Sequence, residues 1–590
     1  MRLAALLAAA GLALSQAHAQ APQHNVVLFV ASGLRPGMIG DLATPATAGV
    51  MRGGVRFTNT HAAFPAGVMP NAAALATGHA PGDTGMFADT EDAGFPVSSA
   101  DQSRTPLLEN NTALAELDAH FGGNMLNEGS VMAAARRAGF STASIGQAGA
   151  ALTFDTQARD GQTTVIVDDR TGRSGGVPLS AEMQQRFQAA KIGLDAPKRS
   201  TDAGDTAQQD WFVQVATDAV LPAFKQRGKP FLLVFWLPDP ESTQEIQTDS
   251  PGRLLPGIDG TTSLAAIRGA DRALGTLQAA LKAQGLDPDT DVIVVSDHGN
   301  STITKESATS FAATQSFPDV PRGSLPPGFV AIDIAHGLQM SLLDPDAGYT
   351  PVSQGKFPSR GNGLIGGDRD HPKVIVTANG GTDLVYVPDP ALALQVLNLL
   401  AGQDYTSGLF VADSIGAVPG TLPLSAIELA GTAVLPAPTI VVNFRSFTTG
   451  CSDPLTCGVE VADSALKDGQ GGAGGFSRAD TLSVAAAIGP DFRAGFVDAA
   501  PVSNADWGRT VAQILGLAIP DTGKLAGRVL REAMPGGAMP AVVRTTLASA
   551  PDAAGRVTLV QVQSASGGRY LDAGGFAGRT LGLDAIPRAP

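Results

Sequence analysis

The chain has 590 residues, a formal net charge of −15, 16% charged and 5% aromatic residues, 70 glycines and 40 prolines. This composition is typical of a loop-rich globular protein with the size of an enzyme. Nucleic acids and anionic membranes are excluded as expected partners, because both bind clustered Lys and Arg and the sequence has no basic run.

Residues 1–19 are predicted to be a secretory signal peptide. Arg2 precedes a run rich in Ala and Leu, and Ala17-His18-Ala19 has the small-x-small pattern of a cleavage site. No later stretch is long and apolar enough to be expected to span a membrane. We therefore expect an exported protein, periplasmic or extracellular.

Unbroken apolar runs predict buried strands that alternate with helices. Such strands are typical of a mostly parallel α/β sheet, covered by helices on both faces. The strands are expected at 25–30, 141–146, 231–237 and 292–295, and the helices at 36–50, 72–76, 130–138, 210–225 and 263–284.

Two loop-rich segments, 150–208 and 301–365, are predicted to be insertions into a domain that covers residues 20–535. Its later part is expected to have strands at 374–376, 384–387, 439–444 and 481–488 and helices at 390–400 and 506–517. The tail, 536–590, is predicted to form a β-hairpin packed on the body.

Cys451 and Cys457 lie six positions apart in a chain expected to be exported. This spacing favours a local disulfide. The alternative is half of a metal site, but the second cysteine pair of a zinc ribbon is missing from the sequence.

The strand at 292–295 ends in Ser296-Asp297-His298-Gly299. Ligand chemistry in an open α/β sheet takes place at the carboxyl ends of the strands. Asp297 and His298 together suit a divalent metal ion, which accepts carboxylate and imidazole ligands. The alternative is a structural strand end with Asp297 in a turn.

Five motifs occur in an order that resembles the type I phosphodiesterase/nucleotide pyrophosphatase family of the alkaline phosphatase superfamily. They are Val26–Arg35, Met69-Pro70-Asn71 with Thr77-Gly78 and Pro81, Pro238-Asp239, Ser296–Gly299 and Gly474–Asp480. The resemblance spans roughly residues 24–535. It implies an alkaline-phosphatase-like sheet flanked by helices, and two zinc-like ions that activate a Thr nucleophile on a phosphate ester.

Four of the seven ligands that the resemblance implies are replaced in this chain. The first-strand Asp, the Thr nucleophile, the His after Asp239 and the late His are replaced by Ser32, Val68, Thr243 and Ala473. Asp239, Asp297 and His298 remain as candidate metal ligands. Shifting the alignment does not recover the missing groups, because no Ser or Thr lies between Thr60 and Thr77 and no His lies between His120 and His298.

Asn71 is the candidate substrate-binding residue, since the resemblance implies that it donates to a phosphate oxygen. It could instead be only the N-cap of the following helix. The N-terminus of that helix would still present backbone N–H groups to an anion. His79 is expected at the end of the same helix, and His371 in a surface loop.

The leading hypothesis is therefore an exported member of this family that has lost its two-metal centre and is catalytically inactive or only very weakly active. It would act as a binding or scaffold protein for a small phosphorylated or nucleotide-like ligand. The expected cofactor is zinc or another divalent metal, or none. The alternative is a working metal-dependent phosphodiesterase or phosphatase that uses Asp239, Asp297, His298 and further ligands such as Asp41 or Asp368. A structural envelope protein is a third hypothesis.

Overall fold

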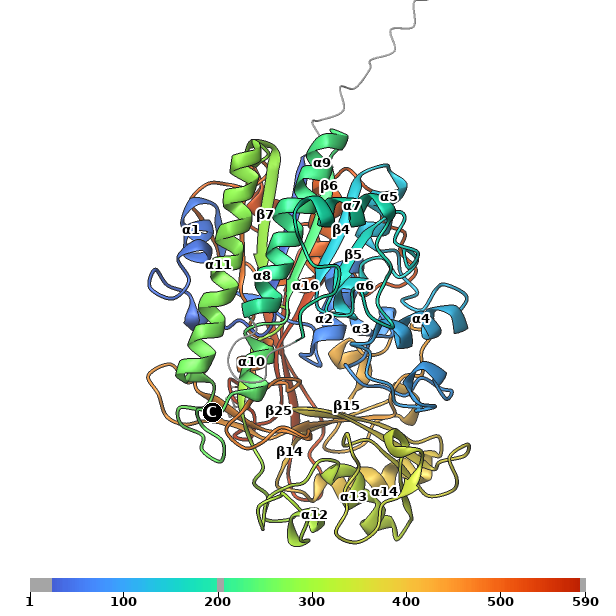
Figure 1. The fold of residues 1–590 in the computed structure, drawn as a ribbon. Coiled ribbons are helices and arrows are strands. Elements are labelled where there is room, and N and C mark those ends of the chain that lie inside the picture. The colour runs from blue at the N-terminus through green and yellow to red at the C-terminus, as the bar shows by residue number, and fades with distance from the viewer. Residues whose placement is uncertain (1–23, 199–205, 584–590) are drawn as a thin grey trace, which may run out of the picture.

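The computed structural model describes residues 24–198 and 206–583. The predicted signal peptide, residues 1–19, lies outside the described residues. Figure 1 shows a large α/β layer in the upper part of the molecule and a second sheet with its own helices below it. Between them run the strand ends and loops that carry the candidate site residues.

The central sheet has eight strands in the order β21-β2-β20-β7-β1-β6-β4-β5. β7, β1, β6, β4 and β5 are parallel to one another, whereas β20 is antiparallel to both β7 and β2. This confirms the predicted α/β class with a mostly parallel sheet. The strands are β1 (Asn25–Ala31), β2 (Val55–Phe57), β4 (Ser141–Gly146), β5 (Val165–Asp168), β6 (Phe231–Leu237), β7 (Thr290–Val295), β20 (Ala485–Ile488) and β21 (Phe496–Asp498).

Helices cover both faces of this sheet because the strands are apolar on both. In β1, Val26, Leu28 and Val30 pack on one face, and the residues between them pack on the other. The first face is covered by α2 (Val68–Thr77), α5 (Val131–Arg137), α6 (Ala150–Thr153) and α16 (Asn504–Ile514). The second is covered by α1 (Pro45–Gly53), α7 (Ala181–Ala189), α8 (Thr206–Gln214), α9 (Leu221–Arg227) and α11 (Thr261–Gln284).

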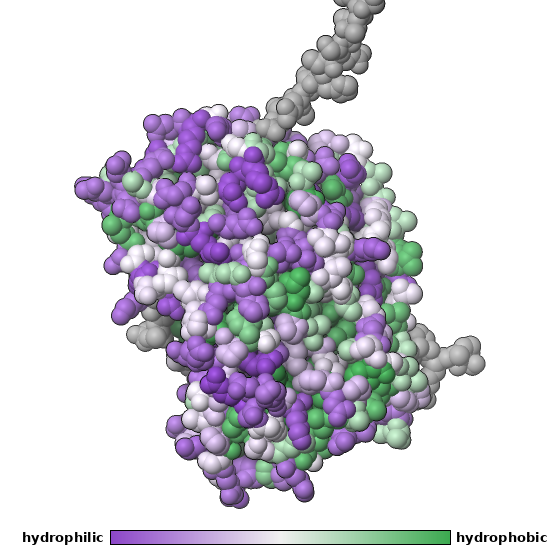
Figure 2. All heavy atoms as spheres, turned by 90° about the vertical axis from the view of Figure 1, so that its right-hand side faces the viewer, coloured by the Kyte–Doolittle hydropathy of each residue, from purple (hydrophilic) through white to green (hydrophobic). Residues whose placement is uncertain are grey.

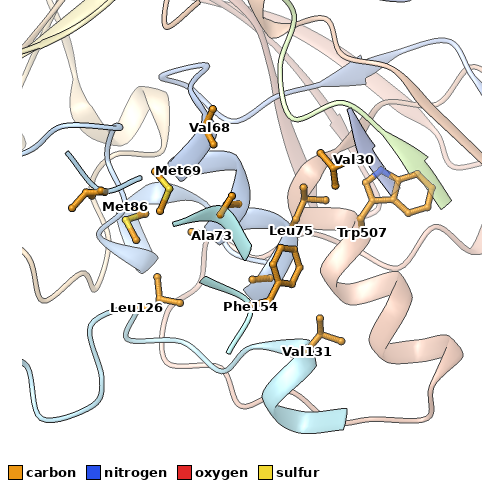
Figure 3. Close-up of a cluster of buried hydrophobic side chains, with 14 of the residues drawn as sticks. Val30, Val68, Met69, Ala73, Leu75, Met86, Leu126, Val131, Phe154 and Trp507 are labelled. Atoms are coloured by element: carbon orange, nitrogen blue, oxygen red, sulfur yellow. The ribbon is translucent and has the colours of Figure 1, made fainter. Parts of the chain in front are cut away.

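The buried cluster on the first face supports α2, whose N-terminus belongs to the candidate site. Figure 3 shows side chains of α2, among them Met69, Ala73 and Leu75, beside Val30 of β1 and Trp507 of α16. All ten residues of α2 are buried. The helix is therefore fixed by packing along its whole length, and its N-terminus is held in a defined place.

A second eight-stranded sheet has the order β10-β9-β11-β12-β13-β16-β14-β15 and is mostly antiparallel. One of its faces packs against helices in a separate hydrophobic cluster. The strands are β9 (Leu342–Asp344), β10 (Thr350–Pro351), β11 (Gly363–Ile365), β12 (Val374–Asn379), β13 (Thr382–Tyr386), β14 (Thr406–Val411), β15 (Leu422–Pro423) and β16 (Ile440–Phe444). The helices are α12 (Phe311–Thr314), α13 (Phe329–Leu338) and α14 (Pro390–Ala401).

Smaller elements connect the two sheets and form the tail. The tail forms a three-stranded sheet of β23 (Val542–Ala548), β24 (Thr558–Ala565) and β25 (Gly568–Phe576), and it contacts the body where Asp572 accepts a hydrogen bond from buried His61. The connecting strands are β3 (Thr60–His61), β8 (Ser301–Thr304), β17 (Ser446–Thr448), β18 (Gly458–Val461), β19 (Gly471–Gly472) and β22 (Val502–Ser503). The short connecting helices are α3 (Pro81–Thr84), α4 (Asn111–His120), α10 (Glu241–Ile246) and α15 (Arg478–Thr481).

Four expected segments differ in the structure. The helix expected over 36–50 is a short 3-10 turn, Pro36–Met38, followed by α1, because Pro45 fits only the first turn of a helix. Residues 150–208 contain β5, which extends the central sheet beside β4, and 301–365 contain α13, β9 and β11 of the second sheet. The strand expected from Thr481 begins at Ala485.

The predicted disulfide is confirmed, with an S–S distance of 2.09 Å between Cys451 and Cys457. Within residues 24–198 and 206–583, no helix combines the length and apolarity that a membrane crossing requires. Figure 2 shows polar residues interspersed with apolar ones over the face turned to the viewer.

Candidate functional site

The carboxyl ends of three neighbouring parallel strands bring the first site residues together. β1 lies between β6 and β7, with Ala31 opposite Leu237 and Val30 opposite Val295. The residues that follow these strands, Ser32, the Pro238–Thr243 loop and Asp297, therefore meet at one edge of the sheet. This is the edge at which open α/β sheets place their chemistry.

Asp297 is fully buried and its carboxylate is held from three sides. Oδ1 accepts hydrogen bonds from the backbone N–H groups of Gly33 (3.0 Å) and His298 (2.9 Å), and Oδ2 accepts one from the Ser32 hydroxyl (2.7 Å). Burial and the neighbouring carboxylate of Glu241 raise the pKa of Asp297, although the charge of His298 opposes this effect. Asp297 is thus an oriented carboxylate in a site that already holds another acid.

His298 points its Nε2 atom between two carboxylates. Nε2 lies 3.3 Å from Oε1 of Glu241 and 3.6 Å from Oδ2 of Asp297, and it makes no hydrogen bond within the described part of the chain. Burial alone would lower the pKa of His298, but the charges of Asp297 and Glu241 raise it well above its ordinary value. Donor atoms of Glu241, Asp297 and His298 all lie within 4.8 Å of one another.

Glu241 is the residue of this cluster that the sequence motifs did not indicate. It is the first residue of α10, and its backbone N–H donates to the Ser32 carbonyl (3.0 Å). Oε2 of its side chain lies 2.7 Å from the Ser32 hydroxyl oxygen, so Glu241 and Asp297 share the single hydrogen of that hydroxyl. Its place two positions after Asp239, in the same strand-end loop, is the one signal in the sequence that could have suggested it.

Asp239 lies in the same loop, but its carboxylate is hydrogen-bonded to the first turn of the following helix, α10. Oδ1 accepts from the backbone N–H (3.0 Å) and hydroxyl (2.8 Å) of Thr243 and from the hydroxyl of Ser242 (3.2 Å), and Oδ2 accepts from the side chain of Gln209. Asp239 therefore caps the first turn of α10. The groups of potential metal ligands found among the described residues include Asp297 and His298 but not Asp239.

A carboxylate occupies the N-terminus of α2, where Val68 is the first helical residue. Oδ1 of Asp89 accepts the backbone N–H of Met69 at 2.7 Å, and a Cβ atom added to Gly67 would lie 2.5 Å from Oδ2. Burial, together with the charge of Glu241, raises the pKa of Asp89 to about 6. The anion position that the helix offers is thus filled by a side chain of this chain.

Asn71 lies inside α2 instead of at its N-cap, because the helix begins at Val68. It is fully buried, donates to the Gly67 carbonyl (2.8 Å), and accepts from the backbone N–H of Ala63 (2.7 Å) and from Asn504 (2.8 Å). Asn504 also donates to the carbonyl of Asp297. The amide of Asn71 therefore connects α2 to the end of β7.

A cavity of about 270 Å³ opens beside these groups, and its walls carry Gly67, Asp89, Glu241, Glu245 and Ala473. Arg360 also lines it. Burial and the charges of Asp89, Glu241 and Glu245 raise the pKa of the neighbouring Glu109 well above its ordinary value. The side of the cavity that faces α2 is thus strongly acidic, and Ala473 contributes no ligand atom to it.

The other candidates lie in different environments. Asp41 is exposed and pairs with Arg52, and Asp368 and His371 form an exposed pair. His79 is buried, 3.0 Å from Asp83 and 3.4 Å from Glu128. The carboxylates of both acids also accept backbone N–H groups of the loop at 522–525, so this network fastens that loop to α3.

Comparisons with known proteins give a family and a set of similar solved structures. The family model described as type I phosphodiesterase / nucleotide pyrophosphatase matches residues 26–322. A solved structure of human ectonucleotide pyrophosphatase / phosphodiesterase 5 (ENPP5, NPP5) is similar at 15% identity and a TM-score of 0.43, over 87% of this chain and 100% of that chain. No match was found among the curated proteins.

Proposed function

Since the chain belongs to the type I phosphodiesterase / nucleotide pyrophosphatase family, we propose that it is an exported member that does not hydrolyse phosphate esters, or does so only very weakly. Export is supported by the disulfide, which persists in oxidising compartments. The signal peptide remains a prediction from the sequence.

The observation that carries the proposal is the hydrogen bond from the Met69 N–H to the Asp89 carboxylate. The resemblance implies that members of the family have the nucleophilic Thr and the bound phosphate at this helix N-terminus. In this chain Val68 has no hydroxyl, and the carboxylate of Asp89 lies where the phosphate would bind. Two unit charges 4 Å apart repel by about 4 kcal/mol at an effective dielectric constant of 20. A phosphate ester would therefore have to displace or protonate Asp89 before it could bind.

The family's two-metal centre is also incomplete. For the ion on the Asp239 side, Asp239 is hydrogen-bonded into α10, Thr243 donates to it, and Ala473 has no donor atom. These residues do not fit a second zinc ion, which needs at least three protein ligands in a catalytic site. We expect any affinity for a phosphorylated or nucleotide-like ligand to be weak, because Asp89, Glu241 and Glu245 face the cavity.

A hydrolase that works with a non-standard ligand set is the second candidate. It is favoured by the Glu241, Asp297 and His298 cluster, which supplies three donors without Asp239. Water would then be the nucleophile, since no hydroxyl is available at position 68.

Hydrolysis of bis(4-nitrophenyl) phosphate, with and without added Zn²⁺ or Mn²⁺, separates the two candidates. We expect turnover no faster than the buffer control, and the same result for Asp297→Ala. Turnover well above the buffer control that is lost on Asp297→Ala would overturn the proposal. In parallel, calorimetric titration with inorganic phosphate should show tighter binding to Asp89→Asn than to the wild type.

A further inference from the structure

We propose that Glu241, Asp297 and His298 bind one divalent transition-metal ion, with Glu241 supplying the carboxylate that position 32 lacks. This inference rests on the proposed function, in that it concerns the same strand ends. It differs from the family's two-metal pattern in the number of ions and in the identity of one ligand.

The tautomer of His298 is set by its neighbour. Nδ1 lies 2.5 Å from the carbonyl oxygen of Gly299, which can only accept, so Nδ1 carries the hydrogen. In the neutral ring, Nε2 then presents its lone pair to the two carboxylates. In metal-binding histidines, the ring nitrogen that does not bind the metal commonly donates its N–H to a backbone carbonyl.

The distances between the donor atoms fit one shared metal ion. Nε2 is fully buried, makes no hydrogen bond within the described part of the chain, and lies 3.3 and 3.6 Å from oxygens of Glu241 and Asp297. Ligands of a tetrahedral site with bonds of about 2.1 Å lie about 3.4 Å apart. Two carboxylates and one imidazole suit zinc or manganese.

Ser32 and Gly33 give Glu241 its place in this cluster. The Ser32 hydroxyl lies 2.7 Å from an oxygen of each carboxylate and donates its one hydrogen between them, while the Ser32 carbonyl accepts the N–H of Glu241. A Cβ atom at position 33 would lie 2.9 Å from the Cβ of Glu241, and Gly33 has a φ of +68°. A glycine is therefore needed for Glu241 to approach the end of β1.

Charge also favours a cation here. With neutral His298, the buried cluster carries two negative charges, and buried charges are stable only when they are paired. A divalent ion would neutralise both. A protonated His298 would neutralise only one, and this purely internal ion pair is the alternative that the experiment must exclude.

The test is calorimetric titration of chelator-treated full-length protein with Zn²⁺ and with Mn²⁺, together with metal analysis after gel filtration. We expect one ion per chain. Glu241→Gln should weaken binding by at least about tenfold, the scale of losing a supporting group of a metal site. Glu245→Gln is the matched control, since it removes an acid of the same helix and cavity that is not in the cluster, and it should change the affinity less than threefold.

Binding of less than one ion, or equal affinity of the wild type and Glu241→Gln, would overturn the inference. If Glu241→Gln does not fold, the visible absorption of the Co²⁺-loaded wild type decides: tetrahedral d–d bands support the site, and their absence overturns it. Phosphodiester turnover is a separate readout. One bound ion without turnover supports both proposals, whereas one bound ion with turnover leaves the site standing and overturns the proposed function.

Discussion

The substitution Asp89→Asn should stabilise the protein at pH 8 and have much less effect at pH 4.5. Asp89 is held at the N-terminus of α2 beside Glu241, and its pKa is raised to about 6 from 3.8. Asparagine has the same shape, keeps an oxygen that accepts the Met69 N–H, and carries no charge. It therefore removes the charge without removing the cap.

The size of the effect follows from the pKa shift. A group that binds its proton more tightly in the folded state lowers the free energy of unfolding as the pH rises from 3.8 to 6, and the penalty is complete above pH 6. Two units correspond to about 3 kcal/mol. Because Asp89 lines a cavity that reaches solvent, we reduce this to about 1–2 kcal/mol at pH 8. About a third of that penalty remains at pH 4.5.

Urea unfolding of the wild type and of Asp89→Asn at the two pH values measures the difference. Asp368→Asn is the control, since Asp368 is fully exposed and its pKa is lowered by hydrogen bonds from the backbone at His371 and Asp370, so no gain at pH 8 is expected. An equal change at both pH values, or a loss of stability at pH 8, would refute the assignment of Asp89 as an unfavourable buried charge.

Two further predictions concern stability. Reduction of the Cys451–Cys457 disulfide, or replacement of both cysteines by serine, should lower the free energy of unfolding by about 2 kcal/mol, because the bond closes a short loop of the unfolded chain. Urea unfolding with and without dithiothreitol measures this difference, and equal stability under both conditions would contradict the prediction. Burial lowers the pKa of His61 to about 4, so its contribution to stability is lost as the pH falls from 6.5 to 4. His61→Asn should therefore reduce the loss of stability over that pH range by about 3 kcal/mol, and an unchanged slope of the acid-unfolding profile would contradict it.

The sequence predicts the strands of the central sheet well wherever they are buried on both faces. β1, β6 and β7 were expected within two residues of their observed bounds because an unbroken apolar run needs no periodicity to be recognised. β5 has four residues and β11 has three, each between polar loops, and such short segments carry no usable pattern. For this reason the sequence predicts the segments 150–208 and 301–365 as loop-rich insertions and does not reveal the strands within them.

The site residues also differ in how well the local sequence predicts their positions. Asp297 and His298 could be placed because they directly follow a recognisable strand, so their position is local information. Asp89 could not, because it is 21 residues from Val68 in the sequence and reaches α2 only through the loop between α3 and α4. Nothing in the residues around Asp89 indicates that its carboxylate will meet a helix N-terminus.

The choice between Asp239 and Glu241 shows why a motif alone does not settle a ligand set. Both acids follow β6, and both could reach the sheet edge. Asp239 accepts hydrogen bonds from the N–H and the hydroxyl of Thr243, the residue that replaces the expected histidine. Glu241 is hydrogen-bonded to Ser32, the residue that replaces the expected aspartate. Two substitutions that look like independent losses in the sequence thus each provide a hydrogen-bond partner for one of the two acids. Thr243 donates two hydrogen bonds to the Asp239 carboxylate, whereas an oxygen of Glu241 lies 3.3 Å from Nε2 of His298, so a count of missing ligands leaves out a donor that faces His298.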